Sequence, residues 1–143
     1  AFGLLVASTI CIAILSEIFV GTIEPMAEKA ISLGSKIGVV ATVASTVQPS
    51  SDLIRNTAKK YGKDVCVNEY LVDGALDILM SGDVDKHNEL VIEAIKKAES
   101  ENDVVVLAQG SMTAILPLLT DIKKPVLTSP RLAVERVKEE LGL

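Results

Sequence analysis

The chain has 143 residues, enough for one domain with a substantial core, and 49% of them are apolar, which excludes a disordered protein. Its net charge of −5 and its few aromatic side chains, two phenylalanines and two tyrosines, exclude the basic face and the stacking platform of nucleic-acid binding. The two cysteines, Cys11 and Cys66, form no CxxC pair, so neither a metal cluster nor a disulfide framework is expected. This cysteine content fits a cytoplasmic protein.

The first 23 residues are almost entirely apolar and are long enough to span a bilayer. Glu17 would be costly inside a membrane, and no basic residues flank the segment to orient it. The alternative is a buried strand over 2–6 followed by a short helix that reaches Phe19. We favour this buried unit, and therefore expect no membrane partner, because the same strand–helix alternation continues along the chain.

The remaining elements alternate between apolar strands and amphipathic helices. We predict strands over 36–42, 64–72, 103–108 and 125–128. The predicted helices before the third strand run from Glu24 to Gly34, from a start at 49–52 to just before Gly62, over 74–80, and over 85–98. A further helix, containing Ile115, Leu118 and Leu119, follows the third strand, and a last helix with Val134, Val137 and Leu141 on one side follows the fourth. This order predicts an α/β fold, a doubly wound parallel sheet with helices on both faces.

Three loops that follow predicted strands are rich in hydroxyls and small residues. Their candidate binding residues are Ser8 and Thr9 in the first loop, Thr42, Ser45 and Thr46 in the second, and Gln109, Gly110 and Ser111 in the third. Ligands of such sheets bind beyond the carboxyl ends of the strands, where helix N-termini offer free N–H groups. The loops therefore predict a site for a small carboxylate, unless their hydroxyls only cap the following helices.

Other catalytic groups are scarce in the sequence. There is no Gly-rich phosphate loop, so we expect no nucleotide, and no organic cofactor or metal is predicted. His87, the single histidine, lies in a predicted helix and is expected to be structural. Cys66 lies within a predicted strand and is expected to be a buried apolar residue. Cys11 is the better candidate for a catalytic thiol because it lies near the first loop, although its neighbours are apolar.

Four stretches carry a resemblance to a known family: TIEPMA at 22–27, KIGVVAT at 36–42 with Thr46, VVLAQGSM at 105–112, and LTSP at 127–130. From about residue 4 to residue 141 the chain resembles the aspartate/glutamate/hydantoin racemase superfamily. The resemblance implies a cofactor-independent enzyme with two pseudo-symmetric lobes and a site between them. Residues 24–143 would form one racemase-like lobe. Residues 1–23 would be the end of a first lobe that is mostly absent, or the buried strand–helix unit described above.

In that superfamily a thiolate on one lobe removes the α-proton and a thiol on the other returns it from the opposite face. Ser8 and Thr9 match the partners of the first thiol, whose own position holds Ala7, and the second thiol position holds Gln109. Neither side chain can exchange a proton in this role. Three explanations stay open: Cys11 serves from a shifted loop, the scaffold performs decarboxylase or other isomerase chemistry, or the protein only binds its ligand.

The sequence thus predicts a racemase-like protein, of the isomerase class, that acts on a small carboxylate such as an amino acid or a hydantoin by α-proton transfer. The alternative is a non-catalytic carboxylate-binding or regulatory module. The apolar opening segment is also consistent with a homo-oligomer.

Overall fold

The structure is a computed structural model that describes residues 23–142. Its centre is a four-stranded parallel sheet with the order β2-β1-β3-β4. The strands are β1 (Lys36–Ala41), β2 (Cys66–Leu71), β3 (Val104–Leu107) and β4 (Val126–Thr128). Each lies inside a predicted strand, so the strand predictions after residue 23 are confirmed.

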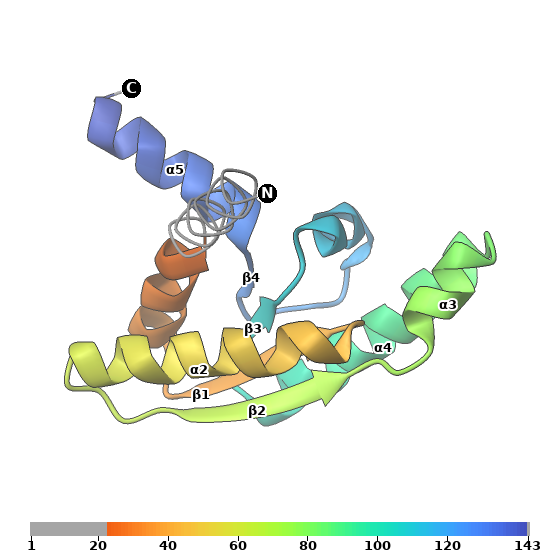
Figure 1. Cartoon of the computed structure of the whole chain (residues 1–143), viewed down its shortest axis with the longest axis horizontal. Coiled ribbons are helices and arrows are strands. Elements are labelled where there is room, and N and C mark those ends of the chain that lie inside the picture. Colours follow the sequence, from red (N-terminus) through yellow and green to blue (C-terminus); the bar gives the residue numbers. More distant parts are fainter. Residues whose placement is uncertain (1–22, 143) are drawn as a thin grey trace, which may run out of the picture.

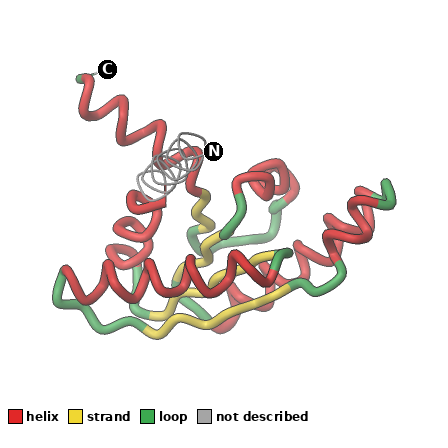
Figure 2. Tube along the Cα trace, viewed as in Figure 1, coloured by secondary structure: helices red, strands yellow, loops and turns green. Residues whose placement is uncertain are grey.

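Helices cover both faces of this sheet, as Figures 1 and 2 show, and the predicted doubly wound α/β class is confirmed. Residues 23–33 are helical and lie with α2 on one face. On the other face lie α4 and the 3₁₀ helix η1. The helices that follow are α2 (Ala44–Lys60), α3 (Ala75–Met80), α4 (Val84–Glu101), η1 (Gly110–Leu118) and α5 (Ser129–Leu141).

The central strands β1 and β3 are buried on both faces, which explains their unbroken apolar sequences. Successive side chains of β3 enter opposite cores. Val104 and Val106 join the core beneath α2, whereas Val105 and Leu107 join the core beneath α4. Because both cores pass through the same two strands, the ends of β1 and β3 are held on a rigid support.

Two helices differ from the prediction, and each contains a proline. Helix α2 begins at Ala44, five residues before the predicted start, and Pro49 lies inside it. Its first turn is fastened by Thr46, whose N–H and hydroxyl both donate to the Val43 carbonyl. The segment after β3 is a 3₁₀ helix and not the regular amphipathic helix expected there. Pro117 lacks the N–H that an α-helix would use, and 3₁₀ spacing still buries Met112 and Ile115.

Two side-chain environments also differ from simple expectation. Cys66 is exposed, so its assignment as a buried apolar residue is wrong; it is the first residue of β2, at the margin of the sheet. Helix α5 carries Val134, Val137 and Leu141 on one side, as predicted, but these side chains are 52–66% exposed. In Figure 1 this helix projects away from the sheet, and none of its residues is buried.

Two carboxylates tie loops to strand and helix ends. Asp103 accepts hydrogen bonds from the N–H groups of Lys36 (2.9 Å) and Ser35 (3.1 Å), and these bonds lower the pKa of its carboxyl. Glu99 accepts from the N–H groups of Lys124 (3.0 Å) and Lys123 (2.7 Å), which lower the pKa of Glu99 in the same way. Both side chains stabilise the fold only in their ionised form.

We therefore expect the melting temperature to fall as the pH drops below about 4.5, the upper end of the usual carboxyl range. A carboxyl whose pKa is lowered by folding contributes stability above its unfolded-state pKa, and that contribution is lost as the pH falls through the folded-state pKa. The double variant Asp103→Asn, Glu99→Gln should show a flatter melting temperature–pH profile in this range. The control Glu93→Gln removes an exposed carboxylate of α4 and should retain the wild-type slope; an equal flattening there would contradict the assignment.

The predictions for residues 1–22 lie outside the described residues. Among residues 23–142, no helix has the length and apolarity needed to cross a membrane.

Candidate functional site

The sheet order defines where a ligand site is expected. From β1 the chain crosses through α2 to β2 on one side, and from β2 it returns through α3 and α4 to β3 on the other side of β1. The connections from β1 and β3 therefore leave in opposite directions. In open parallel sheets, a crevice forms at the carboxyl ends of two such strands. The two predicted loops within the described residues follow β1 and β3.

The register of these strands brings Thr42 and Gln109 together. Val40 pairs with Leu107, so Thr42 and Gln109 each lie two residues beyond a paired position. The Oε1 atom of Gln109 accepts from the N–H of Thr42 at 2.7 Å and from its hydroxyl at 2.9 Å. Thr42 is 8% exposed. Two residues that are 67 positions apart in the sequence are thus hydrogen-bonded to each other at the strand ends.

The rest of the second loop forms the N-terminus of α2. Ser45 is exposed, whereas Thr46 is half-buried and its hydroxyl donates to the Val43 carbonyl at 2.8 Å. This hydroxyl stabilises the first turn of α2 by donating to a backbone carbonyl, and α2 has no side-chain N-cap hydrogen bond, so the capping alternative does not hold for this loop. The N–H groups of Ala44 and Ser45 have no acceptor within the helix, because they belong to its first turn. Among residues 23–142 these two N–H groups have no backbone acceptor, so they can donate to an anion.

The third loop continues from Gln109 into η1. Gly110 and Ser111 are exposed, and their N–H groups open this helix. A Cβ built on Gly110 would meet the Pro130 ring at 3.3 Å, so glycine allows the loop to lie against the start of α5. The strand ends of β1, β3 and β4 therefore meet in one region.

Thr128, at the end of β4, is a strand-end residue that sequence reasoning missed. It pairs in register with Leu107 and is 2% exposed, yet its hydroxyl has no hydrogen-bond partner among the described residues. Buried hydroxyls are normally hydrogen-bonded, but those of Ser51 and Thr113 are unpaired as well, so this property alone does not mark a ligand site. The available signal was a threonine that ends a strand directly before Ser-Pro.

Other candidates do not join this region. Cys66 pairs with Lys36 at the start of the strands, so it lies at the opposite end of the sheet from Thr42. Ser8, Thr9 and Cys11 lie outside the described residues. Within 23–142, the strand ends therefore carry no thiol.

His87 lies in the first turn of α4. It is 7% exposed, and its Nδ1 lies 3.1 Å from the Asn88 side-chain oxygen. It shares a helix face with Val91 and Ile95, which pack on the sheet. These contacts agree with the structural role expected from the sequence.

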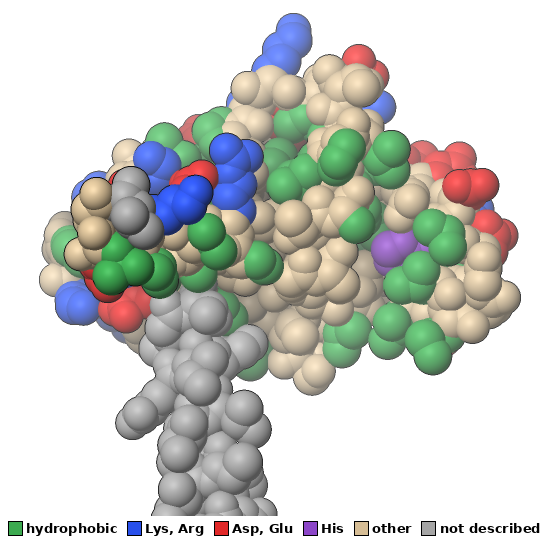
Figure 3. Space-filling model, turned by 90° about the horizontal axis from the view of Figure 1, so that it is seen from above, with side chains coloured by type: hydrophobic (Ala, Val, Ile, Leu, Met, Phe, Trp, Pro, Cys, Tyr) green, Lys and Arg blue, Asp and Glu red, His purple; other side chains and the backbone are tan. Residues whose placement is uncertain are grey.

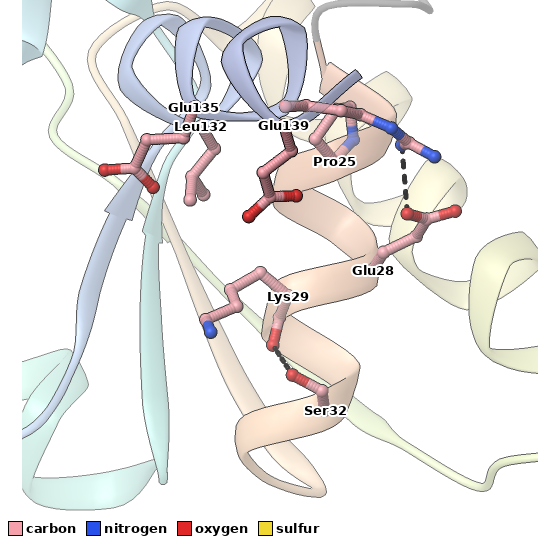
Figure 4. Close-up of a pocket in the computed structure, with 8 residues that line it drawn as sticks. Pro25, Glu28, Lys29, Ser32, Leu132, Glu135 and Glu139 are labelled. Atoms are coloured by element: carbon pink, nitrogen blue, oxygen red, sulfur yellow. Dashed lines mark hydrogen bonds and ion pairs between the residues drawn. The ribbon is translucent and has the colours of Figure 1, made fainter. Parts of the chain in front are cut away.

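A groove of about 390 Å³ lies away from the strand ends, between helix 23–33 and α5 (Figure 4). Its lining includes the carboxylates Glu28, Glu135 and Glu139, and Glu28 already pairs with Arg136 at 3.0 Å. Glu28 also accepts a hydrogen bond from the Tyr61 hydroxyl at 2.9 Å. Because its acids outnumber its cations, Lys29 and Arg136, this groove is a poor site for a small carboxylate.

On the face seen in Figure 3, Asp and Glu side chains gather at the end that holds α3 and the start of α4, whereas the end that holds α5 carries both signs of charge. Helix α5 itself pairs Arg131 with Glu135 and Arg136 with Glu140. The middle of this face is largely uncharged, so a ligand there would be held mainly by neutral hydrogen-bond donors.

The chain thus folds as a doubly wound α/β domain, in which hydroxyl and N–H donors follow the strand ends of β1 and β3 at the switch point. The family model for Asp/Glu/Hydantoin racemase matches residues 18–137, so the chain belongs to this family.

Two solved structures are similar to the chain. Glutamate racemase isoform RacE1 from Bacillus anthracis aligns with a TM-score of 0.56 and 17% identity, over 85% of this chain and 48% of its own. Allantoin racemase from Pseudomonas fluorescens aligns with a TM-score of 0.52 and 20% identity, over 85% of this chain and 52% of its own. At these identities the likeness shows the fold, and the chain spans about half the length of these proteins. No curated protein matched the chain.

Proposed function

We propose that this protein binds a small carboxylate such as an amino acid, or a hydantoin through its ring carbonyl oxygens, at the ends of β1, β3 and β4. It would exchange the α-proton of this ligand without a cofactor. The observation that supports this proposal most is the pairing of Thr42 with Gln109, which joins two strand ends at the switch point. The first turns of α2 and η1, with their N–H groups, directly follow these two strand ends.

These groups suit the electronic demand of α-proton removal. When a base removes the α-proton, negative charge develops on the carboxylate or carbonyl oxygens of the substrate. Fixed N–H and O–H donors stabilise that charge, and because they are already oriented they need little reorganisation. The described residues would thus supply binding and charge stabilisation. The base would be Cys11, whose thiolate would take the proton from the α-carbon and return a solvent-derived proton.

Solvent exchange tests the proposal directly. The full chain is incubated in heavy water with glutamate, aspartate, hydantoin or allantoin, and the α-proton signal is followed by NMR. Loss of that signal for at least one compound is the expected result. Cys11→Ser should abolish the exchange, whereas the matched control Cys66→Ser should retain it, because Cys66 lies at the far end of the sheet.

The second candidate function is a non-catalytic binding module. It is favoured by one specific observation, that Gln109 stands where the family resemblance implies the second thiol. Saturable binding of one of these compounds without any α-exchange would establish the binding module and refute the enzymatic proposal.

A further inference from the structure

The orientation of the Gln109 side chain is determined by its partner. The backbone N–H of Thr42 can only donate, so the atom that faces it must be the Gln109 carbonyl oxygen. The same oxygen accepts the Thr42 hydroxyl. The amide nitrogen therefore points away from Thr42.

Among the described residues that nitrogen has no hydrogen-bond partner. Gln109 itself is half-buried, at the point where β3 leads into η1. The two hydrogen bonds to Oε1, at 2.7 and 2.9 Å, restrict the side-chain rotamer. The result is a pair of N–H donors held in a fixed direction at the end of β3.

We propose that the Gln109 side chain has two roles. Its carbonyl oxygen links the end of β1 to the end of β3 by accepting from Thr42, and its amide nitrogen donates a hydrogen bond to a carboxylate oxygen of the ligand. This role rests on the proposed function, of which it specifies one contact. An amide N–H₂ has no lone pair for a proton and can only donate. It therefore selects the carboxylate end of a ligand, and it disfavours an ammonium group, which also can only donate.

The sequence contains only two glutamines, Gln48 and Gln109, which makes the contact directly observable. Labelling with side-chain ¹⁵N-glutamine gives two N–H₂ groups in the NMR spectrum. Addition of D- or L-glutamate or aspartate should shift the Gln109 signals and leave those of Gln48, which bonds Asp52 on the surface of α2, unchanged. Butylamine, a cation with no carboxylate, should shift neither. If no compound in the set moves the Gln109 signals, the proposal is wrong.

The variant Gln109→Glu tests the two roles of Gln109 separately, the hydrogen bonds accepted from Thr42 and the hydrogen bond donated to the ligand. A carboxylate can still accept both bonds from Thr42, but it offers no N–H and adds a negative charge. The midpoint of chemical unfolding should stay close to that of the wild type. The compound that moves the Gln109 signals in the wild type should bind about tenfold more weakly or worse. Asn56→Asp, the same amide-to-acid change on an exposed part of α2, should preserve binding. Binding of Gln109→Glu within about twofold of the wild type would overturn the proposal.

Should Gln109→Glu fail to fold, Gln109→Met keeps a similar side-chain length without a charge, and its binding is compared in the same way. The two proposals fail separately. If a compound changes the Gln109 NMR signals but its α-proton does not exchange with solvent, catalysis is refuted and the donor role of Gln109 stands. If the α-proton exchanges while the Gln109 signals stay unchanged, only the donor role is refuted.

Discussion

Replacing Gly38 with alanine is expected to lower the free energy of unfolding by about 2–4 kcal/mol. Gly38 lies in the central strand β1, and a Cβ built there would meet the Asn102 Nδ2 at 2.9 Å and side-chain carbons of Ala98 and Tyr70 at 3.2 Å each. Ala98 and Asn102 are buried at the end of α4 and cannot easily move away, and the half-buried Tyr70 is hydrogen-bonded to Asn102. The measurement is urea-induced unfolding followed by circular dichroism.

The cost is large because the methyl group would press on a satisfied polar network. Asn102 is 1% exposed; its nitrogen donates to the Tyr70 hydroxyl and to the Ala98 carbonyl, each at 2.8 Å, and its oxygen accepts from Asn68 at 2.8 Å. Displacement of this amide leaves buried polar groups without partners.

A double-mutant cycle tests this cause. Asn102→Ala creates room for the new methyl group, so the losses of Gly38→Ala and Asn102→Ala should add to clearly more than the loss in the double variant. Strict additivity would show that Gly38 is required for a reason unrelated to Asn102.

The strands could be predicted from the sequence because burial on both faces leaves a direct signal, an unbroken apolar run such as VVVL in β3. Helix starts were harder. Pro49 followed by two serines and an aspartate has the pattern of an N-terminus, but the first turn is instead fastened by Thr46 donating to the Val43 carbonyl. This contact depends on a single hydroxyl three residues from its acceptor, so it produces no recognisable sequence motif.

The site was predictable only in part, for a related reason. The loops after β1 and β3 could be recognised, since hydroxyls and glycine follow apolar strands. The contact of Thr42 with Gln109 could not, because it depends on which strands are neighbours and on the register of Val40 with Leu107. Thr128 was missed because its distinguishing property, a buried hydroxyl without a partner, exists only in the folded chain.

Leu107→Ala is expected to lower the free energy of unfolding by about 2–5 kcal/mol. Leu107 is fully buried, ends β3, and pairs with Val40 on one side and Thr128 on the other. Truncation removes buried apolar surface and leaves a cavity that two flanking strands and the helices of its core cannot easily close. Urea unfolding should show a lower midpoint with an unchanged slope.

The matched control is Leu118→Ala in η1, where the side chain is 48% exposed and the loss should remain under about 0.5 kcal/mol. The comparison bears on the site as well as on the core, because Leu107 supports the strand ends that carry Gln109 and Thr128. Under conditions in which Leu107→Ala is still folded, addition of the carboxylate should change the chemical shift of the Gln109 amide less than in the wild type. The reason is that a more mobile β3 end no longer holds the N–H₂ group in one direction. Equal unfolding midpoints for the two leucine variants would contradict a central position for β3, and with it the rigid support on which the donor geometry depends.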